Sequence, residues 1–144
     1  MSLFQGSRGF VSNLIGAAER ALGVRLPRSY LDALASGAVL DGRRCPTPFP
    51  TSWAADHFEV AALLGIGGPD GIDGEFGSAY LVEEWEYPDI GVVICQTPSG
   101  GHDIVMLDYT ACGPTGEPFV AFIDEDRVPR RVAGSFAEFL AKLE

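Results

Sequence analysis

The sequence predicts a single α+β domain over residues 1–144, with a mixed, mainly antiparallel sheet flanked by helices. Apolar residues recur at helical spacing near both ends of the chain, and three apolar runs typical of strands follow residue 90. The connection between the first two runs is too short for a parallel crossover. With 144 residues, 47% of them hydrophobic, the chain has the length and composition of one globular domain.

Three helices are predicted near the chain ends. Apolar side chains fall at helical spacing over residues 11–22, and Gly23 follows as the left-handed residue that often ends a helix. The segment 26–37 predicts a second, short helix with a proline in its first turn and a glycine at its end. A capping box formed by Ser135 and Glu138 begins a third helix, which we expect to pack on the sheet.

The middle of the chain predicts loops and strands. Residues 38–56 contain three prolines within CPTPFP and predict an irregular surface loop, followed by a candidate strand at 58–66. The glycine-rich segment 67–77 predicts another loop. Almost continuously apolar runs predict central strands covered on both faces, at IGVVIC (90–95), DIVMLDY (103–109) and PFVAFID (118–124).

The turn-forming segment QTPSGGHD predicts an antiparallel hairpin between the first two of these runs. If the strands pair outward from Ser99 and Gly100, the facing residues are Cys95 with Ile104 and Val93 with Met106.

The net charge of −10 is unevenly distributed. Residues 1–55 carry six arginines against three acids, residues 56–82 carry five acids and no base, and residues 83–144 carry twelve acids against four bases. An acidic surface repels nucleic-acid phosphates and anionic lipid, and it attracts basic proteins. We therefore expect a protein partner, with no binding to nucleic acid or to a membrane.

The cysteines and the N-terminus predict a soluble, cytoplasmic protein. Three cysteines without CxxC spacing suit a reducing compartment better than a disulfide framework or a zinc site. The N-terminal segment MSLFQGSRGF lacks the pattern of a secretory leader, and no apolar run reaches the roughly 20 residues that cross a bilayer. We expect no metal and no cofactor.

The polar end of the hairpin is a candidate catalytic site. A hydrolase could use His102 together with Asp103 or Asp108. However, adjacent side chains of a strand point to opposite faces, so Asp103 is poorly placed to orient the imidazole. The structural interpretation, which we favour, is that His102 and Asp103 end a strand and bond to the turn. A nucleotide site at the glycine-rich loop 65–71 is a weaker alternative, because neither its spacing nor a following lysine matches a phosphate-binding loop.

The segment VEEWEYPD, residues 82–89, surrounds two aromatic residues with four acids. Exposed rings among carboxylates are typical of a hot spot for a basic protein partner. Equally, Trp85 and Tyr87 could be core residues of a short helix whose acids face water. The candidate partner-binding residues are those of this segment and of the hairpin end: Glu83, Glu84, Trp85, Glu86, Tyr87, Asp89, His102 and Asp103.

Two parts of the chain resemble the SUKH superfamily, which comprises fungal cell-wall-assembly regulators and many bacterial relatives. AERALGVRLPRSYLDALASG is similar to the opening of these domains, and YPDIGVVICQTPSGGHDIVMLDYTACGPTGEPFVAFIDED is similar to the pattern of the bacterial branch. The resemblance implies an α+β binding module and not an enzyme. It implies a bacterial immunity protein that neutralises a toxin, or alternatively a regulatory scaffold or adaptor.

Overall fold

The computed structural model describes residues 8–144, which form a mixed α+β domain of four helices and seven strands and thus confirm the predicted fold class. Most of the N-terminal segment used to predict the absence of a leader lies outside the described residues. The elements are, in order, α1 (Arg8–Leu22), α2 (Arg28–Ala35), β1 (Arg44–Pro46), β2 (His57–Glu59), β3 (Ala62–Leu63), α3 (Ser78–Trp85), β4 (Gly91–Gln96), β5 (Ile104–Asp108), β6 (Phe119–Ile123), β7 (Pro129–Ala133) and α4 (Phe136–Lys142).

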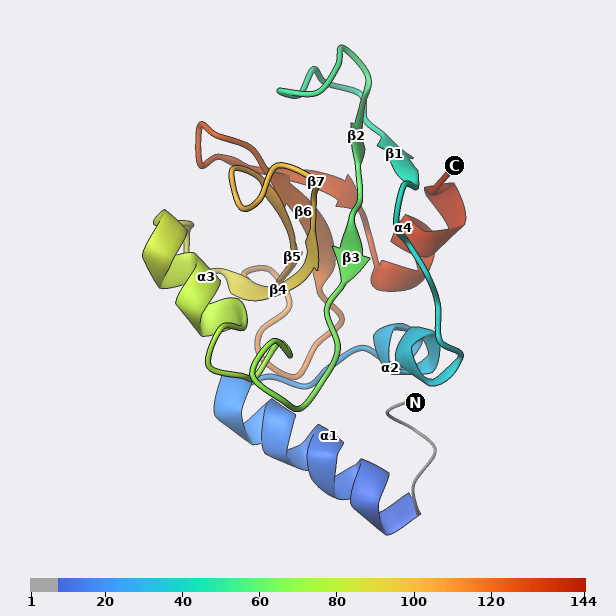
Figure 1. The fold of residues 1–144 in the computed structure, drawn as a ribbon, viewed down its shortest axis with the longest axis vertical. Helices are drawn as coiled ribbons and strands as arrows, with labels where there is room; N and C mark the ends of the chain where they lie inside the picture. The colour runs from blue at the N-terminus through green and yellow to red at the C-terminus, as the bar shows by residue number, and fades with distance from the viewer. Residues whose placement is uncertain (1–7) are drawn as a thin grey trace.

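The strands of residues 8–144 form two antiparallel sheets. Five strands pair in the order β3-β4-β5-β6-β7, and β1 pairs with β2 in a separate two-stranded sheet. Figure 1 shows α2 and α4 on one side of the larger sheet and α3 on the other. The chain end is fixed to β1, since Arg44 and Glu144 exchange backbone hydrogen bonds of 3.0 and 2.8 Å.

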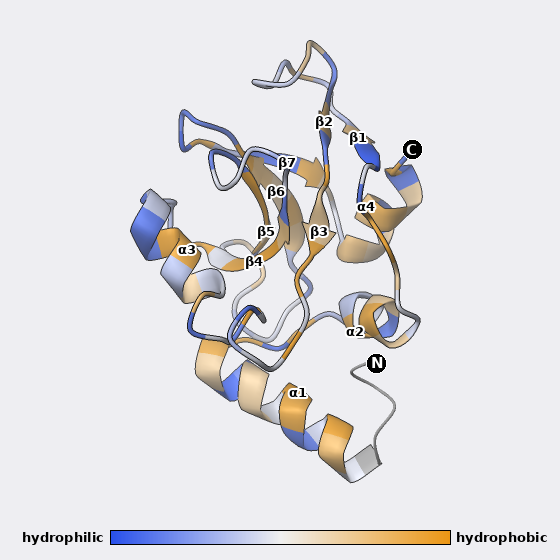
Figure 2. Cartoon of the chain, viewed as in Figure 1, coloured by the Kyte–Doolittle hydropathy of each residue, from blue (hydrophilic) through white to orange (hydrophobic). Residues whose placement is uncertain are grey.

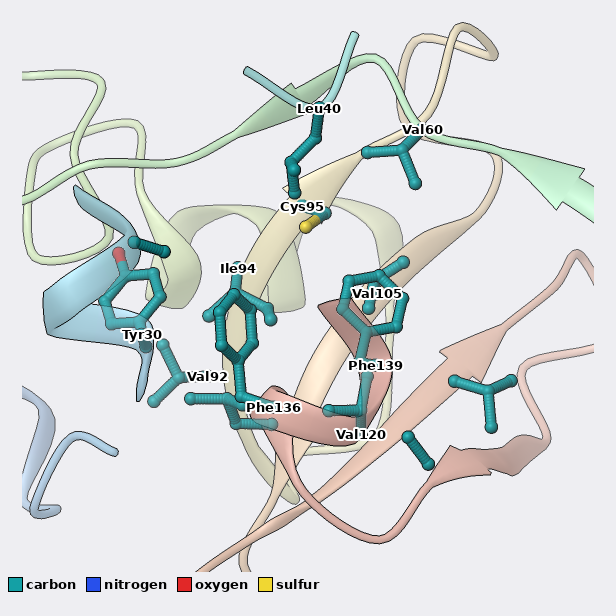
Figure 3. Close-up of a cluster of buried hydrophobic side chains, with 14 of the residues drawn as sticks. Tyr30, Leu40, Val60, Val92, Ile94, Cys95, Val105, Val120, Phe136 and Phe139 are labelled. Carbon is teal, nitrogen blue, oxygen red and sulfur yellow. The ribbon is translucent and has the colours of Figure 1, made fainter. Parts of the chain in front are cut away.

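Both faces of the central strands are buried, as the continuous apolar runs predict. Alternate residues of β4, β5 and β6, such as Val92, Leu107 and Phe122, contribute to the larger core with α2 and α4. Figure 3 shows this core, in which the rings of Tyr30 and Phe136 meet edge to face at 5.6 Å. The residues between them face the smaller core beneath α3, which contains Leu81, Tyr87, Val93, Ile104, Met106 and Ile123.

A β-bulge shifts the predicted hairpin register. Val93 pairs with Met106 as predicted, but the predicted pairing of Cys95 with Ile104 is wrong, because Cys95 pairs with Val105. The extra residue is Ile94, whose carbonyl accepts a 2.8 Å hydrogen bond from the Leu64 amide. Ile94 and Cys95 therefore both lie in the larger core.

The short elements differ most from the prediction. The segment 58–66 is not one strand, because β2 and β3 belong to different sheets. The predicted loop 38–56 contains β1, and β7 lies in a polar segment without an apolar run. The C-terminal helix is confirmed, and the Ser135 hydroxyl accepts the Glu138 amide at 3.1 Å.

Candidate functional site

The acidic segment 82–89 forms the end of α3 and the turn into β4. Glu86 adopts the left-handed conformation, with φ 57°, and caps the helix, so the residues on either side of it point in different directions. Tyr87 is 5% exposed and belongs to the smaller core, whereas Trp85 is half-buried. The acidic rim, which we define as Glu83, Glu84, Glu86 and Asp89, is exposed to solvent.

The Trp85 ring packs closely against the β4–β5 turn at Gly101. A Cβ atom added at Gly101 would lie 2.6 Å from Cε2 of Trp85, and Gly101 has a φ of 115°, which L side chains rarely adopt. The Trp85 ring also meets the exposed His102 imidazole at 5.2 Å between centroids. The helix end and the hairpin turn thus form one continuous surface.

Arg127, in the β6–β7 turn, donates hydrogen bonds to the backbone of both parts of this surface. Its Nε donates to the Trp85 carbonyl at 2.8 Å and its Nη1 to the His102 carbonyl at 3.3 Å. The guanidinium lies 4.4 Å from the centroid of the Tyr87 ring, and the Tyr87 hydroxyl donates to the Gly101 carbonyl. Burial raises the pKa of Tyr87 to about 12, so this hydroxyl stays protonated and keeps its role as donor at neutral pH.

Asp103 is 1% exposed and is surrounded by neutral donors. Its Oδ1 accepts hydrogen bonds from the Thr97 hydroxyl and, at 2.8 Å, from the Ser99 hydroxyl. Its Oδ2 accepts the Trp53 indole at 2.5 Å and the Ser52 hydroxyl at 3.3 Å. Asp103 therefore joins the hairpin turn to the loop between β1 and β2.

The structure does not assemble the hydrolase arrangement considered from the sequence. Asp103 is engaged with the turn and the loop, and Asp108, at the other end of β5, accepts the amide and hydroxyl of Thr110 at 2.9 and 2.7 Å. Within residues 8–144, the structure gives the His102 ring nitrogens no hydrogen bond and brings together no group of three or more metal-ligating side chains. His102 contributes an exposed ring to the surface.

The glycine-rich loop before α3 uses its own amides internally. Gly67 donates to Asp73 Oδ1 at 2.9 Å, and Ile72, which is buried in the larger core, donates to the Gly65 carbonyl at 2.8 Å. A phosphate cradle needs free amides that converge on an anion. This loop instead folds on itself and sets the start of α3.

Exposed aromatic residues that were not singled out from the sequence include three in the loops and in α3. Phe76, Tyr80 and Trp53 are 48, 40 and 37% exposed. Phe76 and Tyr80 are four residues apart and out of phase with the buried Ser78 and Leu81, and this helical phase is the signal that could have found them. Trp53 follows a proline-rich loop and has no periodic signal.

Residues 8–144 thus form an α+β domain with an exposed acidic and aromatic surface where the end of α3 meets the β4–β5 turn. A family model described as the SMI1 / KNR4 family (SUKH-1) matches residues 12–142, so the chain belongs to that family. Searches among curated proteins and among solved structures found no match. None of the helices in residues 8–144 has the length and apolarity to cross a membrane.

Proposed function

We propose that this chain is a non-enzymatic protein-binding module, namely a bacterial immunity protein that neutralises a partner toxin in the cytoplasm. Membership of the SUKH-1 family supports a binding module. The partner, on this proposal, is a basic toxin domain, and the contact surface is the acidic rim together with Trp85 and His102.

The charge distribution carries the proposal. Residues 45–126 contain fifteen acids and no lysine or arginine, and they include α3 and the β4–β5 hairpin. The arginines of the N-terminal third lie outside this segment. The four exposed acids of the acidic rim outnumber Arg127, the cation bonded to this surface, and leave it negatively charged. Such a surface speeds the approach of a basic protein and orients it.

The surface is also held in place before any partner arrives. Arg127 bonds to the backbone of both Trp85 and His102, and Gly101 lets the Trp85 ring lie against the turn. A rigid surface loses less conformational entropy on binding. On this proposal the buried Tyr87 and Asp103, both candidate contact residues from the sequence, act as supports beneath the surface and do not touch the partner.

Co-expression with the product of each neighbouring gene, followed by calorimetry of any complex, tests the proposal. We expect a complex whose affinity falls with salt and falls at least tenfold when Trp85→Ala, Glu84→Gln and Glu86→Gln are combined. The double variant Glu84→Gln/Glu86→Gln keeps the Trp85 contacts and should show part of the loss. Asp41→Asn/Glu117→Gln removes two exposed acids elsewhere and serves as the charge-matched control.

The same experiment separates an immunity protein from a regulatory adaptor. An immunity protein restores growth to cells that express the partner, whereas an adaptor binds a partner that is not toxic. Equal affinity of the triple variant and the wild type would refute the assigned surface, and a harmless partner would refute toxin neutralisation.

A further inference from the structure

Helix α3 has an unpartnered outer face in addition to the surface described above. The inner face, Ser78, Leu81, Val82 and Trp85, is buried or half-buried against the sheet and the hairpin. We define the outer face as Phe76, in the turn before the helix, with Tyr80, Glu83 and Glu84. Figure 2 shows hydrophilic residues concentrated at the C-terminal end of α3.

The aromatic half of the outer face is an ordered pair. The rings of Phe76 and Tyr80 meet edge to face, with centroids 5.4 Å apart and planes at 85°. Phe76 is held by its own amide, which donates to the Pro69 carbonyl at 2.9 Å, and by the folded glycine-rich loop before it. The pair steadies the start of α3, yet both rings keep a large part of their area in contact with water.

Two other aromatic rings of the chain, unlike those of Phe76 and Tyr80, each have an arginine stacked over them. Arg127 lies over Tyr87 at 4.4 Å, and Arg131 lies over Phe119 at 3.8 Å from the ring centroid. Within residues 8–144, no cation lies over the ring of Phe76 or of Tyr80. The nearest charged residues along the helix are the carboxylates of Glu83 and Glu84.

We propose that the outer face of α3 is a docking surface for an arginine-bearing segment of the basic protein partner. Helical spacing puts Glu83 and Glu84 one turn beyond Tyr80, about 5–6 Å away between Cβ atoms. A guanidinium that stacks on the exposed ring of Tyr80 can therefore direct its N–H groups to these carboxylates, while Phe76 extends the aromatic surface beside it. Arginine fits better than lysine, because its planar group both stacks and forms paired hydrogen bonds with a carboxylate.

This inference rests on the proposed function only in that the partner is a basic protein. It adds a second contact area, centred about two helical turns from Trp85 and independent of the Trp85 ring. The two areas share Glu83 and Glu84, so one partner element that follows α3 could contact both.

The test is an amide-resolved NMR titration of the full chain with a short peptide of alternating arginine and glycine. Matched peptides carry lysine, or the uncharged citrulline, in place of arginine. We expect shifts confined to residues 76–84, several-fold weaker binding of the lysine peptide and no binding of the citrulline peptide. Phe76→Ala/Tyr80→Ala should weaken arginine-peptide binding about threefold to tenfold, as should Glu83→Gln/Glu84→Gln.

Two controls keep the result specific. Val39→Ala removes apolar area from another exposed residue, and Asp41→Asn/Glu117→Gln removes two exposed charges elsewhere. The inference is overturned if these controls weaken binding equally, if Phe76→Ala/Tyr80→Ala has no effect, or if the shifts lie on another surface. It is also overturned if the wild type self-associates in sedimentation and Phe76→Ala/Tyr80→Ala abolishes this, because the occupant is then a second copy.

The outcomes distinguish this inference from the proposed function. The peptide titration needs no natural partner, so its failure leaves the complex tested with the triple variant unaffected. Conversely, if no neighbouring gene product binds, the proposed function fails while the peptide result stands. If a natural partner is found, Phe76→Ala/Tyr80→Ala should weaken it at least threefold, and circular dichroism should show that the variant is folded.

Discussion

The two faces of α3 carry similar residues but have different environments. Each face has large side chains, yet Leu81 and Trp85 contact the sheet and the hairpin, while the rings of Phe76 and Tyr80 contact each other and remain 48 and 40% exposed. The surrounding acids do not decide which ring is exposed. The helical phase decides it, because residues three and four positions apart share a face and adjacent residues do not.

The largest loss of stability is expected for a substitution on the inner face of α3. Leu81→Ala removes a side chain buried in the smaller core and should lower the free energy of unfolding by about 2–4 kcal/mol, measured by urea denaturation. Tyr80→Ala, one residue away on the outer face, is the matched control and should change it by about 1 kcal/mol or less, because only the ring pair with Phe76 is lost. Similar losses for the two variants would break the distinction between the faces.

A smaller loss is expected where the inner face meets the hairpin. Gly101→Ala forces a Cβ atom against the Trp85 ring and strains a residue at φ 115°, so we expect a loss of about 2–3 kcal/mol. Gly100→Ala has a positive φ of 74° but open space around its Cβ, and should lose only about 1 kcal/mol. Equal losses in thermal denaturation would mean that the Trp85 contact contributes nothing.

Removing the Arg127 contacts tests how firmly the C-terminal end of the inner face is held against the hairpin. Arg127→Met keeps the aliphatic stem but removes the bonds to Trp85 and His102 and the cation over Tyr87, which should cost about 1–2 kcal/mol. Tryptophan fluorescence should shift to the red as Trp85 gains exposure. Arg130→Met, whose ion pair with Asp126 is exposed, should leave the emission unchanged.

The smallest change in stability is expected for Asp126, an exposed acid outside α3. It shows how little an exposed charge of this protein contributes to stability, for comparison with the acids of the outer face. The hydrogen bond from Arg130 lowers the pKa of Asp126 below its ordinary 3.8. Because the pKa of the folded state is the lower one, the stabilisation is present above pH 3.8 and is lost as the pH falls through the lowered value. Asp126→Asn should therefore reduce the melting temperature slightly at neutral pH and not in acid. A constant difference across pH would contradict this cause.

The central sheet could be predicted because its signal is local. Val92, Val105 and Phe122 lie in runs so apolar that only strands covered on both faces accommodate them. The β7 strand escaped prediction because its residues, PRRVA, are polar at an exposed edge and form a strand only by pairing with β6. The bulge at Ile94 escaped because the hydrophobic pattern of β4 is continuous and fixes no register.

The exposure and burial of the candidate partner-binding residues could be predicted only in part. The acids of segment 82–89 are exposed, as both interpretations of that segment require. The interpretations differ in the rings, and here Tyr87 lies in the core while Trp85 is half-buried. Which interpretation holds for each ring depends on Arg127 and Gly101, which are distant in sequence. The contacts of Asp103 with Ser52 and Trp53 are equally non-local, so no pattern around Asp103 could reveal its burial.

The inserted residue in β4 also determines which side of the sheet the hairpin end serves. Side chains alternate between the two faces of a strand. The extra residue, Ile94, interrupts this alternation: even-numbered Val92 faces the larger core before it, and odd-numbered Cys95 faces the same core after it. If β4 continued in regular pairing without the bulge, Cys95 would pair with Ile104 and turn toward α3, and Thr97 would turn away from the carboxylate of Asp103 that it now serves as a donor. The bulge thus aligns Thr97 with the same carboxylate that accepts the Trp53 indole of the β1–β2 loop, although β1 and β2 do not pair with the larger sheet.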